Sequence, residues 1–391
     1  MTEALSKFAA AISGVGALAG IGYYLTCLWS AGSYLRDRSR ILAQDKVPAA
    51  FPAVSILKPL KGEDPEIYES FRSHCRQEYS EFEIVFGVSD ANDPAVQAVE
   101  RLRREFPDRS IQLIVCTDVL GANTKVSNLA QMVRRARYDH LIVSDSDIRV
   151  PPDYLRRVVA PLAEPGIGLV TCLYRGIAGP TVSSKLEALG ISTDFCAGVL
   201  VARSIEGGLR FALGSTMAFR RQDLEAIGGF ESFVDYLADD YELGKRIAGL
   251  GRKVRVSDVV VETFLPSYTV REFFDHQLRW ARGVRGARPG GYSGLLFTFG
   301  WQWALLALFA SGGAMWASSV FAAAVVLRFL VAWIVGVDAL ADRQVPRFSP
   351  LIPLRDLVGV LVWISGFASN TVTWRGDRFQ VKNGKLTRLV S

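Results

Sequence analysis

The sequence lacks the cysteine patterns that would stabilise a small fold. Its five cysteines are odd in number, lie far apart and never form a C-x-x-C pair; they are Cys27, Cys75, Cys116, Cys172 and Cys196. Zinc sites and disulfide frameworks depend on such pairs. Internal repeats and low-complexity tracts are missing as well. We therefore predict reduced cysteines that serve in packing, with no disulfide and no zinc site.

Charge is absent from an N-terminal segment. The 28 residues 8–35 contain no Asp, Glu, Lys or Arg, and that length crosses roughly 30 Å of hydrocarbon. A cleaved signal peptide is the alternative, but its apolar core would be shorter and would end in small residues, whereas Tyr23, Tyr24 and Trp29 lie toward the end of this segment. The basic stretch 36–40 follows at once, so the positive-inside rule places the next part in the cytoplasm.

Further apolar blocks lie near the C-terminus. They cover 289–337, interrupted only by Arg328, and 357–374, and supply two or three crossings. The basic tail 375–391 favours the cytoplasm. An even number of crossings returns it there, so one candidate segment should lie in the interface or re-enter. The apolar segment 182–205 is expected to be too short to span, and to be a buried core element or the lining of a lipid-facing groove.

Between these blocks, short apolar runs alternate with helical patterns. The runs at 54–57, 83–88, 111–116, 141–144 and 167–172 predict strands, and 93–106 and 124–137 predict helices. Apolar runs without alternation are typical of strands buried on both faces, so an open, mostly parallel α/β sheet is expected. Ligands of such sheets bind beyond the carboxyl ends of the strands.

Acidic residues follow two of these strands. Asp90 ends the second, and Asp145 and Asp147 follow the fourth. Two carboxylates one residue apart can hold Mg²⁺ or Mn²⁺ through oxygen ligands, and such an ion offsets charge on a departing diphosphate. The alternative is that these aspartates only cap the following turn.

A third acidic cluster opens a helix at Asp239 and Asp240. One of the pair is expected to cap the helix, which leaves the other free to act as a general base. Further along, the helix 270–285 carries His276-Gln-Leu-Arg279-Trp280. A guanidinium beside an indole suits a diphosphate and a sugar ring, while an amphipathic helix lying on the bilayer is the alternative.

These motifs together resemble the ceramide glucosyltransferase family, within the family-2 type glycosyltransferases of GT-A fold. They are K-P-L-K-G at Lys58, V-S-D-A-N-D-P-A at Asp90, D-S-D-I-R-V at Asp145, D-D-Y at Asp239 and H-Q-L-R-W at His276. The resemblance covers residues 52–288 and the layout of the apolar segments. Bacterial relatives of this family include glycosyltransferases of the hopanoid pathway, so a ceramide and a hopanoid polyol are both implied acceptors.

The resemblance also implies roles for single residues. It assigns Asp90 to the uridine, Asp145 and Asp147 to the metal and diphosphate, Asp240 to catalysis as the base, and Arg279 with Trp280 to the donor diphosphate and acceptor site. Two positions depart from the family. His276 stands where Gln or Arg is usual, and Asp147 stands where the eukaryotic ceramide enzymes lack a second aspartate.

Four other residues are candidates for donor or acceptor contact. Lys58 and Lys125 are expected to help bind phosphate or uridine, with solvated loop lysines as the alternative. Gly214 and Ser215 are expected at a point of close approach to donor or acceptor, with ordinary turn chemistry as the alternative.

The predicted protein is an α/β GT-A (Rossmann-like) open mixed sheet between membrane segments. Its expected parts are an anchor at 1–35, a cytosolic catalytic domain at 36–288, membrane helices at 289–374 and a cytosolic tail at 375–391. It is expected to lie in a bacterial inner membrane, with its catalytic domain in the cytoplasm. It is also expected to transfer glucose or N-acetylglucosamine from a UDP-sugar to a lipid hydroxyl, with a divalent metal (Mg²⁺ or Mn²⁺) as cofactor. The net charge of +6 is compatible with a nucleic-acid partner, with anionic lipids and with phosphorylated substrates, so it does not decide between them. The expected partners are a UDP-sugar, a membrane lipid and the bilayer, with no nucleic acid. A processive polysaccharide synthase and a polyprenyl-phosphate sugar transferase are the alternatives.

Overall fold

A computed structural model describes residues 2–43, 51–374 and 376–389. The chain divides into two compact units, which are described separately. The helical unit comprises Met1–Arg40, Thr181–Ile205 and Tyr268–Asn370, and the sheet unit comprises Ile41–Pro180, Glu206–Ser267 and Thr371–Ser391. The division differs from the expected one, because the segment after Pro180 and the C-terminal strands each join a unit that is distant in sequence.

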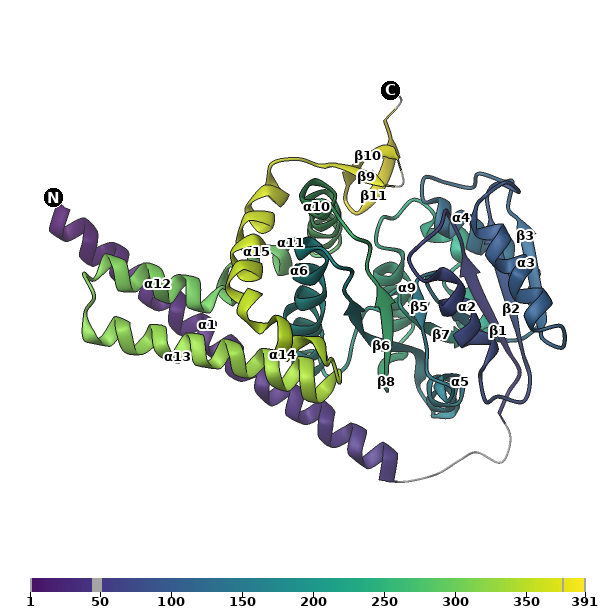
Figure 1. Cartoon of the computed structure of the whole chain (residues 1–391), viewed down its shortest axis with the longest axis horizontal. Helices are drawn as coiled ribbons and strands as arrows, with labels where there is room; N and C mark the ends of the chain where they lie inside the picture. The colour runs from purple at the N-terminus through teal and green to yellow at the C-terminus, as the bar shows by residue number, and fades with distance from the viewer. Residues whose placement is uncertain (1, 44–50, 375, 390–391) are drawn as a thin grey trace. The chain divides into compact units, whose positions relative to one another are not determined.

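The sheet unit is built on an eight-stranded sheet (Figure 1). Its spatial order is β3-β2-β1-β4-β7-β6-β8-β5. Strands β1 to β4 run parallel to one another, whereas β7 is antiparallel to both β4 and β6. The strands are β1 (Val54–Pro59), β2 (Phe82–Val88), β3 (Ser110–Val115), β4 (His140–Val143), β5 (Ile148–Arg149), β6 (Ile167–Ile177), β7 (Met217–Arg220) and β8 (Lys253–Phe264). The open mixed sheet and all five predicted strands are confirmed.

Burial explains why four of those five strands could be predicted, whereas β3 has no buried residue. Every residue of β1 and β2 is buried, so both faces select apolar side chains and no alternation appears. Strand β8 begins as a mixed run that includes Lys253 and Arg255, and β5 and β7 are two and four residues long. These three strands carry no comparable run, and the pattern did not predict them.

Helices cover the sheet (Figure 1), and one of them is shorter than expected. They are α2 (Ile67–Cys75), α3 (Ala95–Glu105), α4 (Thr124–Met132), α5 (Tyr154–Val159), α8 (Arg221–Ala226) and α9 (Asp239–Gly249), with 3₁₀ turns η1 (Ala160–Ala163) and η3 (Phe230–Phe233). The prediction that the α4 helix extends to residue 137 is wrong. The backbone N–H of Arg137 donates to the buried carboxylate of Glu83 at 2.6 Å, so it bonds the sheet instead of continuing the helix.

The end of the chain forms a small sheet on the sheet unit. Its strands are β9 (Thr371–Trp374), β10 (Asp377–Lys382) and β11 (Lys385–Arg388). Asn383 and Gly384 both have positive φ, which a two-residue hairpin turn requires. Val372, Phe379, Val381 and Leu386 pack with Leu237. The expected helical block 357–374 and tail 375–391 are therefore corrected: helix ends at Phe367 and strands follow. Arg375 lies outside the described residues.

The helical unit contains several helices that are long and apolar enough to cross a membrane. By length and composition four stretches qualify: Glu3–Ala43, Val182–Ile205, Met315–Ala339 and Gln344–Phe367. A fifth would be the pair Pro289–Thr298 and Gly300–Ala310, which is bent by 51°. The elements are α1 (Thr2–Ala43), α6 (Val182–Gly190), η2 (Ile191–Phe195), α7 (Cys196–Ile205), α10 (Val270–Ala287), α11 (Pro289–Gly294), η4 (Leu295–Thr298), α12 (Gly300–Ala310), α13 (Met315–Val331), η5 (Ala332–Ala339), α14 (Gln344–Phe348), η6 (Ser349–Leu351) and α15 (Ile352–Phe367).

The segment 182–205 forms one continuous helix. It was expected to be too short to span, and this is wrong, because the π-helical turn η2 joins α6 and α7 without a break. The 24-residue helix is also 61% buried over its apolar window. It is therefore a buried helix of this unit, which agrees with the first of the two alternatives, a buried core element.

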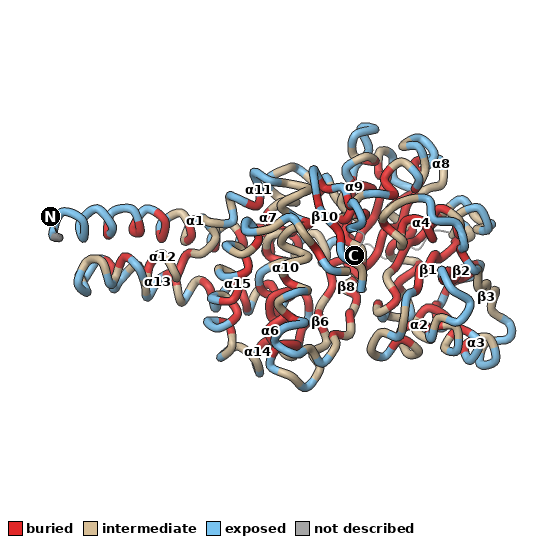
Figure 2. Tube along the Cα trace, turned by 90° about the horizontal axis from the view of Figure 1, so that it is seen from above, coloured by how far each residue is buried: buried red, intermediate tan, exposed pale blue. Residues whose placement is uncertain are grey.

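Many residues along α1, α12 and α13 are exposed (Figure 2). Among their apolar side chains, Phe8, Leu18, Phe309 and Val326 are each more than half exposed. Exposed apolar side chains along long apolar helices are typical of helices that contact lipid. The five cysteines are all free and buried, as predicted.

Small residues let α1 and α12 approach closely. A Cβ added to Gly20 would lie 2.1 Å from the Cα atom of Gly300. Ala17, Trp301 and Ala304 pack beside this crossing. Membrane helices have little hydrophobic force between them and associate through such close contacts of small residues.

We predict that Gly20→Ala weakens this packing by about 1–3 kcal/mol, because backbone cannot move aside as a side chain can. Thermal unfolding in detergent measures the loss. Gly22→Ala is the matched control, since a Cβ at Gly22 meets no atom within 4 Å. Both variants gain the same helix propensity, so equal unfolding temperatures would contradict the contact.

Candidate active site

The turn after β4 carries Asp145 and Asp147, and a buried lysine fixes its backbone. The Lys58 ammonium donates to the Ser144 hydroxyl at 3.2 Å and to the Asp145 carbonyl at 2.8 Å. Lys58 is 0% exposed. Burial lowers the pKa of Lys58 to about 7, although Asp147, Asp145 and Asp64 favour its charged form. The structure therefore gives Lys58 a positioning role, and its contact with a donor stays a prediction.

The side chain of Asp147 is bonded to strand β8, which is separated from β4 in the sheet by β7 and β6. Its carboxylate accepts a 2.5 Å hydrogen bond from Thr263 on β8. Burial, with repulsion from Asp145, raises the pKa of Asp147 to about 6, and the Thr263 hydroxyl opposes that rise. Between the two aspartates, the Ser146 hydroxyl donates to Asp64 at 2.5 Å. Hydrogen bonds to Lys58, Asp64 and Thr263 thus fix the turn.

Gly214 brings two carboxylates to one point. Its backbone N–H donates to Asp240 Oδ2 at 2.9 Å. A Cβ at this position would lie 2.8 Å from Asp145 Oδ2 and 3.6 Å from Asp240 Oδ2. Because Gly214 has no side chain, the two carboxylates can approach each other there, while its contact with donor or acceptor stays a prediction. Ser215 is buried, with its hydroxyl donating to the Cys172 carbonyl of β6 at 3.0 Å.

Lys125 neutralises this cluster. Its ammonium lies 2.7 Å from Asp145 Oδ1 and 2.9 Å from Asp239 Oδ2. Burial alone would lower the pKa of Lys125, but the carboxylates of Asp145, Asp239 and Asp240 outweigh it and raise the pKa above its ordinary value. Lys125 is at the start of α4, where the Asn123 side chain caps the helix. The turn after β4 and the starts of α4 and α9 thus meet at one cation.

Asp240 is the less neutralised member of the acidic pair. Burial and the adjacent Asp239 raise the pKa of Asp240 to about 6, against the effect of Lys125. The expectation that one of the pair caps α9 is wrong, since the cap residue is Ala238 and no side chain caps the helix. Instead Asp239 pairs with Lys125, and Asp240 Oδ1 accepts the Tyr241 N–H at 2.7 Å.

Asp90 lies on the same edge of the sheet. Strands β2 and β4 both pair in parallel with β1, so their carboxyl ends face one direction. Asp90 is exposed and accepts the Asn92 N–H at 2.9 Å. The neighbouring Asp93 accepts the Gly62 N–H with both oxygens at 3.0 Å. This bond ties the loop after Lys58 to the loop that carries Asp90.

Sequence reasoning missed four residues that organise the site. Asp239 was expected only as a cap, and Asp64, Asp93 and Thr263 were not singled out. Asp64 and Asp93 lie within or beside two recognised motifs, which is a signal that could have found them. Thr263 is the next-to-last residue of the unpredicted strand β8, and only the sheet order brings it to Asp147.

The last predicted residues lie on α10, in the helical unit. The Trp280 ring is 5.9 Å from the Phe195 ring and 5.3 Å from the His276 ring, centroid to centroid. His276 stacks on Tyr268 and has Nδ1 3.0 Å from a Glu187 oxygen. His276, which stands where Gln or Arg is usual in the family, thus lies beside the buried carboxylate of Glu187. Arg279 follows on the same helix, partly buried.

Oxygen ligands for a divalent metal are available at Asp145. Among the residues that the structure describes, no three His, Cys, Asp or Glu side chains are grouped to enclose an ion. Mg²⁺ is held in many enzymes by one or two carboxylates together with substrate phosphates. Asp145 is 37% exposed in its side chain and has Asp147 behind it, so the residues fit an ion that also binds a diphosphate.

The open mixed sheet with aspartates along its carboxyl edge defines a glycosyltransferase of GT-A fold. The mannosyltransferase PcManGT from Pyrobaculum calidifontis, solved with GDP-Man and Mn²⁺, shares the fold with a TM-score of 0.51 at 21% identity. That alignment covers 87% of this chain and 98% of the other. Residues 13–387 match glycosyl transferase family 21, and the chain belongs to that family.

Sequence relatives act on lipids, by their names. Ceramide glucosyltransferase 1 of Caenorhabditis elegans is 25% identical over 86% of this chain and 73% of its own length. Ceramide glucosyltransferase 3 of the same organism is 26% identical over 71% of this chain, a match that spans 61% of that relative. Beta-monoglucosyldiacylglycerol synthase of Synechocystis is 28% identical over 53% of this chain and 42% of its own length.

We predict that Lys125→Met destabilises the sheet unit, because Asp145 and Asp239 lose their shared cation. Breaking a fully buried pair costs about 3–5 kcal/mol, and the lower end is expected here since Asp145 keeps contact with water. Chemical denaturation measures the change. Lys253→Met is the matched control, at an exposed position of β8. Equal stability of the two variants would contradict the bridging role of Lys125.

Proposed function

We propose that this chain transfers a sugar from a UDP-sugar donor to the hydroxyl group of a membrane lipid, with inversion at the anomeric carbon. The observation that carries the proposal is the meeting of Asp145 and Asp240 at Gly214. A carboxylate beside a metal-binding candidate suits a reaction in which one group takes a proton while a diphosphate departs. Membership of family 21 supports the same reaction class.

Asp240 acts as the general base. As the acceptor oxygen attacks the anomeric carbon, its proton passes to Asp240, a new carbon–oxygen bond forms, and the bond to the diphosphate breaks to release UDP. Attack from the face opposite the leaving group inverts the configuration. The Gly214 N–H holds one Asp240 oxygen at 2.9 Å and so fixes the direction of the base. No covalent intermediate with the protein is needed.

The donor is bound along the carboxyl edge. Asp90 takes the uridine, while Asp145 and Asp147 hold the metal, which when bound supplies positive charge to the diphosphate. Arg279 and Trp280 serve the donor diphosphate and the acceptor. Lys58 keeps the backbone of Asp145 in place, and Lys125 keeps the Asp145 carboxylate oriented before the ion and donor arrive.

The acceptor is an uncharged lipid with a free hydroxyl. The names of the relatives point to ceramide and to diacylglycerol as acceptors, and the exposed apolar residues of α1, α12 and α13 suit residence in a bilayer. A hopanoid polyol is a candidate on the same chemistry. From the basic stretch 36–40 we infer that the sheet unit faces the cytoplasm of a bacterial cell at the inner membrane, where nucleotide-sugars are available.

A product assay tests the function. Purified protein in lipid nanodiscs is incubated with UDP-glucose, UDP-N-acetylglucosamine or UDP-galactose and with ceramide, diacylglycerol, bacteriohopanetetrol or a polyprenyl phosphate, and products are identified by mass. One hexose or N-acetylhexosamine added per lipid is expected. A sugar polymer would favour a processive synthase, and a product formed only on polyprenyl phosphate would favour that transferase; either result overturns the proposal.

Asp240→Asn is expected to reduce transfer by at least about 100-fold, the lower end for loss of a general base. Binding of UDP-sugar, followed by calorimetry, should change little because the amide keeps the shape of the side chain. Asp108→Asn, an exposed position after α3, is the matched control. Full activity of Asp240→Asn would remove the base assignment.

The pH profile gives a second check on the base. A base must be unprotonated to act, and the pKa of Asp240 is raised to about 6. Activity should therefore be present above that pH and fall as the pH decreases through it. If the loss of activity came from protonation of Asp147 at the metal site, added Mg²⁺ would restore activity at low pH. If it comes from Asp240, as expected, the decrease in activity at low pH stays the same when Mg²⁺ is added.

Asp147→Asn should weaken metal-dependent donor binding about tenfold or more, since one carboxylate of the metal site is lost. Calorimetric titration of UDP-sugar at several Mn²⁺ and Mg²⁺ concentrations measures the effect. Asp153→Asn, past the end of the same turn, serves as the control. Donor affinity that stays equal to the wild type across the metal titration would count against the site.

A further inference from the structure

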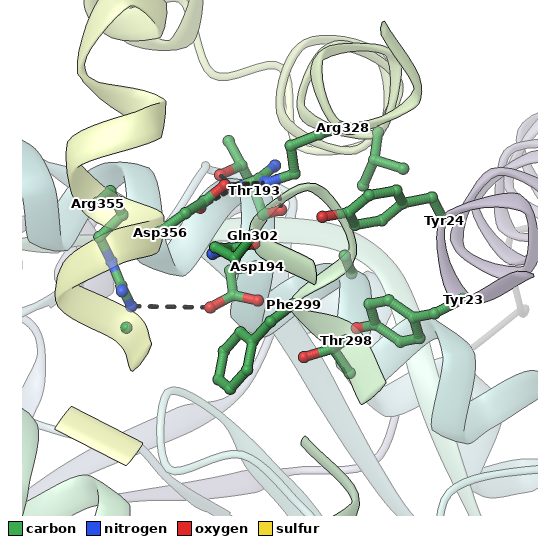
Figure 3. Close-up of a pocket in the computed structure, with 13 residues that line it drawn as sticks. Tyr23, Tyr24, Thr193, Asp194, Thr298, Phe299, Gln302, Arg328, Arg355 and Asp356 are labelled. Atoms are coloured by element: carbon green, nitrogen blue, oxygen red, sulfur yellow. Dashed lines mark hydrogen bonds and ion pairs between the residues drawn. The ribbon is translucent and has the colours of Figure 1, made fainter. Parts of the chain in front are cut away.

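A polar pocket lies within the helical unit, among the candidate membrane spans. Its lining comes mainly from α1, η2, α12, α13 and α15, and the pocket together with the open solvent at its mouth occupies about 410 Å³ (Figure 3). Four charged residues face it: Asp194, Arg328, Arg355 and Asp356. The sequence pattern had singled out only Arg328 as a charge within an apolar block. Ionisable groups inside membrane spans are costly and mark functional sites by default.

One of the two ion pairs is saturated. Arg328 donates to Asp356 through two bonds, at 2.8 Å from Nε and 2.7 Å from an NH₂ group. Its remaining donors reach the Thr193 carbonyl at 3.3 Å and hydroxyl at 3.2 Å. Trp301 also donates to Asp356 at 2.9 Å. This network joins α12, α13, α15 and η2, and it offers little bonding capacity to a ligand.

The other pair is loose. The nearest nitrogen and oxygen of Arg355 and Asp194 are 3.8 Å apart, beyond hydrogen-bond distance. Arg355 is nine-tenths buried, and its Nε is a buried donor with no hydrogen-bond partner. The Asp194 side chain is 53% exposed. Figure 3 shows its carboxylate in the middle of the pocket, between Arg355 and the side of Tyr23 and Thr298.

A third polar group points to a ligand independently. The Gln302 side chain on α12 lines the pocket, and its Oε1 atom is buried without a hydrogen-bond partner. Leaving a buried acceptor unpaired costs free energy that a bound donor would recover. Asp194 itself is on the π-helical turn η2, a deviation found most often at functional sites.

The charges of the pocket select the kind of ligand. Two arginines and two aspartates cancel, so the pocket as a whole does not attract an anion. Asp194 and Gln302 Oε1 accept hydrogen bonds, while the Arg355 NH₂ group that faces Asp194 donates one. A head group with hydroxyl or amide hydrogens and an oxygen acceptor, but without net charge, completes all three. A phospholipid phosphate would instead meet the Asp194 carboxylate.

We propose that this pocket binds the uncharged, hydroxyl-bearing head of the lipid acceptor. The inference rests on the proposed lipid glycosyl transfer, which it deepens by naming an acceptor site in the helical unit. Asp194 and Gln302 accept the head-group hydrogens, and Arg355 donates to its oxygen. The Arg328–Asp356 network keeps the pocket walls together without contacting the ligand.

The test uses the full chain in phosphatidylcholine nanodiscs. Two variants of equal shape, Asp194→Asn and Gln302→Met, each remove one acceptor of hydrogen bonds, and Asp338→Asn is the control, at an exposed position in η5 outside the pocket. Kinetics with ceramide and with diacylglycerol should show an acceptor KM raised about tenfold in both variants, the effect of one lost hydrogen bond of about 1.4 kcal/mol. The donor KM and the hydrolysis of UDP-sugar by water should stay at the wild-type level, which also shows that the variants fold.

A binding readout separates this inference from the proposed function. A photoactivatable ceramide should label peptides of η2, α12 or α15 in the wild type and in Asp338→Asn, and should label them several-fold less in the two pocket variants. A photoactivatable phosphatidylglycerol should not compete. An unchanged acceptor KM with labelling elsewhere, or displacement by phosphatidylglycerol, overturns the inference. If no sugar-lipid product forms in any assay, the proposed function fails, while the labelling still decides whether the pocket binds a neutral lipid.

Discussion

The candidate site depends on how a group of buried carboxylates is kept together. Asp145, Asp239 and Asp240 lie at one edge of the sheet, where low polarity strengthens their mutual repulsion. Lys125 offsets that repulsion through two short ion pairs, and the Gly214 N–H bonds the carboxylate that Lys125 leaves least neutralised. Because Gly214 has no side chain, Asp145 and Asp240 can approach the same point. The arrangement holds a base and a metal-binding candidate side by side.

The pKa values of two lysines of the site are shifted in opposite directions. Lys125 is paired with carboxylates and keeps its proton, whereas Lys58 is enclosed among backbone and hydroxyl oxygens and its pKa falls to about 7. The first balances charge, and the second shapes the turn that presents Asp145.

The helical unit also contains charged side chains that pair with one another, in less polar surroundings. Its Arg328–Asp356 pair is tight and fully bonded, and it fastens four elements together. The Arg355–Asp194 pair is long and leaves bonding capacity unused. A saturated ion pair stabilises packing, while an unsaturated one needs a further partner. For a protein that modifies lipids, a head group is a partner that already resides in the same bilayer.

The sequence by itself determined the anchor, five strands, the acidic strand ends and the family, because each is local. A buried strand needs a continuous apolar run, and a span needs an uncharged stretch. It did not determine strand β8, the helix through η2, or the C-terminal hairpin sheet. Nor did it predict that Thr263, Asp64 and Lys125 surround the aspartates, or that Asp194 faces Arg355. Those contacts join residues far apart in the chain, and only the order of strands and the packing of helices brings them within bonding distance.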